Sequence, residues 1–169
     1  MAAGLLIDDD LGLIESVQRA AAAAKLDLAT ATTWDEGLGL FHVLSPNVVI
    51  ADYNMPGSQH GLLLLARIRR LRPSVRLVLI SGFLEESDME RVRALNLVDR
   101  TLTKGSVLES ARVVVDEVRQ AQEASLAPTD WREVADAAVA AAEIPEADLT
   151  ELDQILSRKA DERSRNKAR

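Results

Sequence analysis

Five side chains that could do chemistry stand directly after short apolar runs of this chain. Carboxylates are ligands that Mg²⁺ prefers beside phosphate, and a carboxylate can also attack phosphorus as a nucleophile. An ammonium and a hydroxyl opposite the carboxylates can hold the oxygens of a phosphoryl group. These residue types together therefore favour phosphoryl chemistry at a magnesium site. In chain order, the side chains are Asp8, Asp9, Asp52, Ser81 and Lys104.

The apolar runs are typical of buried strands, and segments with apolar residues at helical spacing separate them. Strands alternating with helices five times over predict a parallel sheet with helices on both faces. The carboxyl ends of such strands lie at one edge of the sheet, where ligands bind, so we expect the five side chains to converge there. Strands are predicted at 3–7, 26–31, 48–52, 75–80 and 100–103, and helices at 13–25, 33–45, 61–72, 86–95 and 106–122.

The third of these helices has the strongest pattern. Its leucines and isoleucine recur at positions that predict an inward face, and its arginines are expected to face solvent. The predicted inward residues are Leu62, Leu65, Ile68 and Leu71, and the predicted outward residues are Arg67, Arg69, Arg70 and Arg72.

Three carboxylates at one edge of a sheet repel one another. At a separation of 4 Å and an effective dielectric constant of 20, each pair of charges costs about 4 kcal/mol. A protein keeps such a cluster when a cation compensates the charge, and Mg²⁺ is a hard cation that binds oxygen ligands. The sequence therefore predicts Mg²⁺ as the cofactor.

With these residues in place, the chain resembles the receiver domain of bacterial two-component response regulators. The acid pair Asp8-Asp9, Asp52 followed by Met55-Pro56-Gly57, Ser81 and Lys104 match that family in order and spacing. The resemblance covers roughly residues 3–124. It implies a flavodoxin-like (βα)5 doubly wound fold with strand order 2-1-3-4-5. We accordingly expect a receiver domain at 1–124, a linker at 125–128 and a helical extension at 129–169.

The resemblance also implies roles for individual residues. Asp52 would be the phosphoacceptor, taking a phosphoryl group from a histidine kinase or a phosphotransfer protein. Ser81 and Lys104 would bind the phosphoryl oxygens. The protein would not be an enzyme in the ordinary sense, although slow self-dephosphorylation is expected. The implied ligands of Mg²⁺ are Asp9, Asp52, the backbone carbonyl of Asn54 and, through water, Asp8.

Three features depart from the family pattern. The loop 56–61 is one residue longer than usual and carries His60 before its last glycine. Gly105 follows Lys104 where the family commonly has proline. Thr101 stands in place of the aromatic residue that commonly reports movement of the Ser/Thr hydroxyl. Signalling either proceeds without that aromatic or is weakened.

Two alternatives remain open at this point. In a haloacid-dehalogenase type of phosphohydrolase, Asp8 would be the nucleophile and Asp10 the general acid, but Asp52 and the Met-Pro pair after it would have no role. A receiver-like module that binds a partner without phosphorylation is the second alternative, favoured by the departures at Thr101 and Gly105.

Composition limits the partners and the compartment. The net charge is −7, which argues against broad nucleic-acid binding because such binding depends on neutralising phosphates. The chain has no cysteine and no apolar run long enough to span a membrane. We therefore expect a cytoplasmic protein that contacts neither DNA nor a membrane.

The extension is predicted to form two helices. Asp130 and Glu133 form a capping box for the first, whose apolar stripe comprises Trp131, Val134, Ala135, Ala138 and Val139. Pro145 suits the first turn of the second helix, whose stripe comprises Leu149, Leu152, Ile155 and Leu156. These stripes need a cover, and we expect packing on the receiver, a homodimer or a downstream protein target. The basic tail, 158–169, is expected to be a solvated, frayed end.

Overall fold

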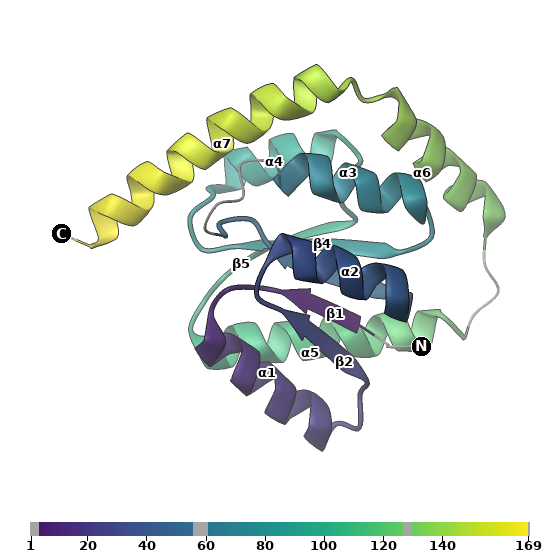
Figure 1. Cartoon of the computed structure of the whole chain (residues 1–169), viewed down its shortest axis with the longest axis vertical. Helices are drawn as coiled ribbons and strands as arrows, with labels where there is room; N and C mark the ends of the chain where they lie inside the picture. The colour runs from purple at the N-terminus through teal and green to yellow at the C-terminus, as the bar shows by residue number, and fades with distance from the viewer. Residues whose placement is uncertain (1–3, 56–60, 127–129, 169) are drawn as a thin grey trace.

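A five-stranded parallel sheet forms the centre of the protein (Figure 1). The structure is a computed structural model and describes residues 4–55, 61–126 and 130–168. The strand order is β2-β1-β3-β4-β5, which confirms the predicted doubly wound fold. The strands are β1 (Gly4–Ile7), β2 (Leu28–Ala31), β3 (Val48–Asp52), β4 (Arg76–Ser81) and β5 (Arg100–Thr103).

Helices cover both faces of the sheet (Figure 1). One face packs against α1 (Leu11–Ala23) and α5 (Val107–Ala124), and the other packs against α2 (Trp34–Leu44), α3 (Gly61–Leu71) and α4 (Glu86–Ala94). Each face has its own apolar core. The core under α1 and α5 is aliphatic, and the other adds Trp34, Phe41 and Tyr53 to its aliphatic side chains. All five residues of β3 are buried, as expected of a central parallel strand.

Side-chain caps fix where several of these helices begin. The Asp10 carboxylate accepts hydrogen bonds from the first turn of α1, and the Thr33 hydroxyl accepts one from Glu36 at the start of α2. Ser106 and Glu109 form a capping box at the start of α5. Because of these caps, α1 and α5 start directly after the ends of β1 and β5, where Asp8, Asp9 and Lys104 lie.

The C-terminal helices α6 (Trp131–Glu143) and α7 (Glu146–Lys167) form an outer layer on α3 and α4 (Figure 1). Leu149, Leu152 and Leu156 of α7 are buried in the core cluster that also holds the inner faces of α3 and α4. Arg70 of α3 donates hydrogen bonds to the carbonyls of Ala141 and Ile144 at the corner between α6 and α7. The leucine stripe of α7 is therefore covered by the chain itself.

The predicted orientation of two α3 residues is wrong. Arg69, expected to face solvent, is 3% exposed, and its guanidinium donates to the carbonyls of Pro73 and Val75 and to the Asp99 carboxylate. Leu71, expected to face inward, is 53% exposed. Arg69 can be buried because its guanidinium donates to several acceptors that surround it.

One prediction for the extension is also wrong, and another is untested. Trp131 and Val139 of the predicted α6 stripe are exposed, so the receiver does not cover them, and a second copy or a target protein stays open as their cover. The basic tail is not frayed, because α7 continues to Lys167 and several of its cations bind α4 and the loop before it. At the start of α6, Asp130 caps the helix by accepting from the backbone of Arg132.

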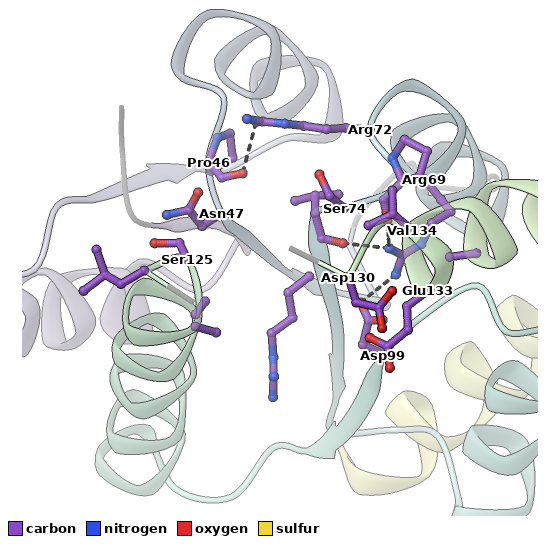
Figure 2. A pocket seen from close by; sticks show the side chains of 17 residues that line it. Pro46, Asn47, Arg69, Arg72, Ser74, Asp99, Ser125, Asp130, Glu133 and Val134 are labelled. Atoms are coloured by element: carbon purple, nitrogen blue, oxygen red, sulfur yellow. Dashed lines mark hydrogen bonds and ion pairs between the residues drawn. The ribbon is translucent and has the colours of Figure 1, made fainter. Parts of the chain in front are cut away.

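A pocket of about 760 Å³ lies between the end of α5 and the start of α6 (Figure 2). It is at the amino edge of the sheet, where Asn47 and Val75 precede β3 and β4. Charged side chains of both signs line it, with Arg72 bonded to the Pro46 carbonyl on one wall and Asp130 and Glu133 on another. The pocket is therefore separate from the carboxyl edge.

The long loop predicted before α3, which carries His60, falls on residues 56–60 and lies outside the described residues. Within the described part of the chain, no helix has the length and apolar character needed to cross a membrane.

Candidate functional site

Three carboxylates meet at the carboxyl edge of the sheet. β1 and β3 are neighbours with Ile7 opposite Ala51, so the residues that follow them come side by side. Asp8, Asp9 and Asp52 each offer an oxygen, and these oxygens lie within 4.8 Å of one another. Asp8 is 0% exposed and Asp52 4% exposed, whereas Asp9 faces solvent.

Lys104 lies over this cluster and joins its two buried members. Its ammonium is 2.8 Å from Asp52 Oδ2, 3.0 Å from Asp8 Oδ1 and 2.8 Å from Asp8 Oδ2. Lys104 follows β5, and its backbone amide donates to the carbonyl of Ser81 at the end of β4. Lys104, at the end of the outermost strand β5, therefore reaches the carboxylates that follow the central strands β1 and β3.

Burial and charge act in opposite directions on these groups. Burial raises the pKa of the Asp52 carboxyl above its ordinary value, and the Lys104 ammonium only partly offsets this effect. Burial likewise raises the pKa of Asp8, and the Asp52 charge adds to the increase. Burial alone would lower the pKa of Lys104, but the carboxylates of Asp52 and Asp8 outweigh it and raise that pKa.

The cluster has the donor set of a site for a hard divalent cation. All its donor atoms are carboxylate oxygens, and Asp8 Oδ2 is buried with no hydrogen-bond partner among the described residues beyond its ion pair with Lys104. A buried oxygen with so few partners is costly unless a further cation or a water engages it. Asn54 also lies here, with its backbone amide donating to Asp52 Oδ1 at 3.2 Å. The residues present therefore fit Mg²⁺, which binds oxygen ligands and retains several waters.

Ser81 ends the strand beside the cluster, but its hydroxyl is engaged elsewhere. The side chain is 0% exposed, and its oxygen accepts hydrogen bonds of 3.2 Å from the amides of Phe83 and Leu84. These bonds fix the first turn after β4. Ser81 is thus near the cluster in the sheet, with its hydroxyl bonded to the loop that leads to α4.

The remaining sequence-predicted residues have structural partners. Asp10 caps α1 and does not belong to the carboxylate cluster. The Thr101 hydroxyl accepts a hydrogen bond from Arg93 of α4. The Lys104–Gly105 peptide bond is trans, and the Gly105 amide donates to the Ser110 hydroxyl.

Asp153, a buried acid of α7 that contacts the residue directly after Asp52, was not predicted from the sequence. Its carboxylate accepts hydrogen bonds from the Tyr53 hydroxyl at 2.8 Å and from the Leu62 amide at 2.9 Å. Burial and the Asp153 charge raise the pKa of Tyr53 above its ordinary value of 10.0. Asp153 falls four residues after Leu149 and three before Leu156, so helical spacing places it on the apolar face of α7. An acid on an apolar face indicates a buried carboxylate with hydrogen-bond donors around it, and this was the available signal.

Fold and site together define a doubly wound α/β protein with a carboxylate–lysine cluster at the carboxyl edge of its sheet. The response regulator receiver domain model matches residues 5–109, and the chain belongs to this family. Receiver domains are the phosphoacceptor components of two-component systems and bind Mg²⁺ at an acidic pocket. A search of curated proteins found no match.

Solved structures share this fold. The receiver domain of HemR from Leptospira biflexa is 22% identical, with a TM-score of 0.57 over 68% of this chain and 91% of that one. The receiver domain of NtrX from Brucella abortus is 23% identical, with a TM-score of 0.56 over 69% and 98%. The N-terminal domain of a Wolinella succinogenes protein is 25% identical, with a TM-score of 0.58 over 74% and 99%.

Proposed function

We propose that this chain is a two-component response regulator that accepts a phosphoryl group on Asp52 in a Mg²⁺-dependent reaction. The observation that carries the proposal is the Lys104 ammonium, bonded at once to Asp8 and Asp52 beside a third carboxylate. In such a cluster, the Lys104 ammonium can leave the carboxylates and bind the oxygens of an incoming phosphoryl group instead. The donor would be a histidine kinase or a phosphotransfer protein.

The transfer requires little of the protein beyond position and charge. An oxygen of the Asp52 carboxylate attacks phosphorus, the O–P bond forms, and the P–N bond to the donor imidazole breaks. The imidazole nitrogen leaves with the electron pair. Lys104 and the Ser81 hydroxyl then donate to the phosphoryl oxygens. Slow attack of water on the same phosphorus would return the carboxylate, giving self-dephosphorylation.

The metal-ligating groups in this proposal are oxygens of the same edge. Asp9, Asp52 and the Asn54 carbonyl would hold Mg²⁺ directly, and Asp8 would do so through water. Bound there, Mg²⁺ would offset the negative charge of the carboxylates and of the phosphoryl oxygens.

The proposed output is contact with a protein, either a downstream target or a second copy, and not binding to DNA. The first part of the extension is acidic, and three cations of the basic tail, Lys159, Arg163 and Lys167, already bind groups of this chain. Phosphate neutralisation needs free cations, so this arrangement disfavours DNA binding. A cytoplasmic location is part of the same proposal, because the phosphoryl donors of two-component systems act there.

Intact mass after incubation with acetyl phosphate tests the proposal. The wild type should gain one phosphoryl group with Mg²⁺ and none with EDTA, and Asp52→Asn should gain none under either condition. Asp10→Asn is the matched control, because asparagine caps a helix as well as aspartate does and α1 remains intact. Asp10→Asn should therefore label like the wild type. Wild type that binds Mg²⁺ but gains no mass would point to a phosphorylation-independent interaction module.

A further inference from the structure

Helix α7 contacts the segments that follow β3 and β4, two of the strands that end at the candidate phosphorylation site. Toward its middle, Asp153 bonds the hydroxyl of Tyr53, which directly follows Asp52, and the amide of Leu62 at the start of α3. Toward its end, Arg163 donates to the carbonyl of Phe83 at 2.7 Å and Lys167 to that of Gly82 at 3.3 Å. One helix is therefore fastened to the segment after β3 and to the segment after β4.

Cations of α7 also hold the first turn of α4. Lys159 is 2.6 Å and Arg163 2.9 Å from the carboxylate of Asp88, which is 0% exposed. Arg163 reaches Glu85 as well, at 3.0 Å. Lys167 lies over the Phe83 ring, 5.1 Å from its centre. The tail of α7 is thus seated on residues 82–88, which begin immediately after Ser81.

The same loop is held from its other side by the Ser81 hydroxyl. That oxygen accepts from the amides of Phe83 and Leu84, so it fixes the segment whose carbonyl binds Arg163. If Ser81 turns to donate to a phosphoryl oxygen on Asp52, both amides lose their acceptor. The segment must then shift, and the carbonyl positions on which Arg163 and Lys167 depend shift with it.

The two halves of α7 are held by interactions of different kinds. The first half buries Leu149, Leu152 and Leu156 in the core. The second half buries Ala160 and is otherwise held by polar contacts of Lys159, Arg163 and Lys167 with residues 82–88. A shift of the loop after Ser81 that moves the start of α4 would therefore act on the second half, while the leucines keep the first half packed.

We propose that α7 is the element that reports phosphorylation, with residues 157–167 seated on the loop after Ser81 in the unphosphorylated protein and loosened when Asp52 carries a phosphoryl group. This inference rests on the proposed function. It gives the chain an output route that does not need an aromatic residue at Thr101, whose hydroxyl is bonded to Arg93. The signal passes from Ser81 to α7 through Phe83.

Hydrogen exchange on the full chain tests this inference, with intact mass read from the same sample. Amides of 157–167 should exchange about tenfold faster after phosphorylation, a typical size for coupling between two sites. Amides of α1 should not change. A chain that gains the phosphoryl group with unchanged exchange in α7 overturns this inference alone. A chain that gains no mass overturns the proposed function and this inference with it.

Two matched arginine variants sharpen the test. Arg163→Gln removes the bonds to Phe83, Glu85 and Asp88, so α7 should already exchange faster before phosphorylation and change less after it. Arg165→Gln alters an exposed arginine of the same helix and should behave as the wild type does. Because coupling free energies are reciprocal, Arg163→Gln should also shift the phosphotransfer equilibrium with a phosphorylated donor protein toward the phosphorylated form of this chain. Equal behaviour of the two variants would contradict the inference.

Discussion

The hydroxyl of Tyr53 donates a 2.8 Å hydrogen bond to the carboxylate of Asp153, 100 residues further along the chain. Tyr53 directly follows Asp52, the candidate phosphoacceptor, and Asp153 is 0% exposed in the middle of α7. The same carboxylate accepts from the Leu62 amide, so the C-terminal helix supplies a cap for the start of α3. The extension is therefore part of the structure that surrounds the site.

Replacing Asp153 should cost more stability than replacing its tyrosine partner. Asp153→Ala leaves the buried Leu62 amide without an acceptor and weakens the bonding of the Tyr53 hydroxyl, so the free energy of unfolding should fall by about 2 to 3 kcal/mol. Tyr53→Phe removes one hydrogen bond and leaves the cap, for a loss of about 1 kcal/mol. Urea denaturation of both variants measures the difference. Equal losses would mean that the cap on α3 is not important.

Arg69 should be the most costly arginine of α3 to replace. Arg69→Met would remove the donor to the carbonyls of Pro73 and Val75 and one of the two donors to the Asp99 carboxylate, at a cost of roughly 2 to 3 kcal/mol. Arg67→Met, at an exposed position of the same helix, should stay within about 0.5 kcal/mol of the wild type. Thermal or chemical denaturation compares the two. Similar losses would contradict the buried position of Arg69.

Lys104→Met should make stability depend strongly on Mg²⁺. Without the ammonium, the buried charges of Asp8 and Asp52 face each other, and in EDTA the free energy of unfolding should fall by about 3 kcal/mol. Saturating Mg²⁺ should recover much of this loss, because a cation bound only by the folded state stabilises it. Adding Asp52→Asn should also recover stability in EDTA, since one of the two charges is then gone. If neither Mg²⁺ nor the added Asp52→Asn substitution changes the free energy of unfolding of Lys104→Met, the charges of Asp8, Asp52 and Lys104 are not coupled.

The contact between α7 and α4 should weaken in acid. Burial favours the neutral form of Asp88, but bonds from Lys159 and Arg163 outweigh it and hold the pKa below its ordinary value of 3.8. A lowered pKa in the folded state gives stability that is present above the ordinary value and is lost as pH falls through the folded value. The free energy of unfolding should therefore drop below about pH 4.

Asp88→Asn is the control for this acid dependence. The variant loses the charge that pairs with Lys159 and Arg163, while an asparagine oxygen can still accept from the Glu85 amide. It should be less stable than the wild type at neutral pH, and the difference should shrink as the pH falls below about 4. A constant difference across the range would show that Asp88 does not contribute through its charge.

The positions of site residues at the ends of strands could be predicted from the sequence, because the topology of the sheet alone determines them. Asp8, Asp52 and Lys104 each stand at the end of a strand, and parallel strands bring their ends to one edge whatever the packing of the helices. The direction of the Ser81 hydroxyl could not be predicted in this way. It depends on a rotamer and on two loop amides, which leave no periodic signal.

The contacts that polar residues on helix surfaces make with other elements could not be predicted from sequence patterns. Arg69 falls among arginines that spacing places outside, and only its hydrogen-bond acceptors in two separate segments, 73–75 and 97–99, explain its burial. The basic tail has the composition of a frayed end, yet Lys159, Arg163 and Lys167 recur every four residues and continue the packed face of α7. The spacing of these residues in the sequence indicates a common face of α7, but it does not indicate that this face packs on α4.

The measurement that tests the central claim most directly is chemical location of the phosphoryl group. After labelling with acetyl phosphate and Mg²⁺, borohydride reduces an aspartyl phosphate to homoserine, and tandem mass spectrometry of the tryptic fragment 26–67 identifies the converted residue. The account predicts homoserine at position 52, dependent on Mg²⁺, with Asp27 and Asp35 of the same fragment unchanged as internal controls. Conversion at another aspartate, or none in protein that has gained the phosphoryl mass, would contradict it.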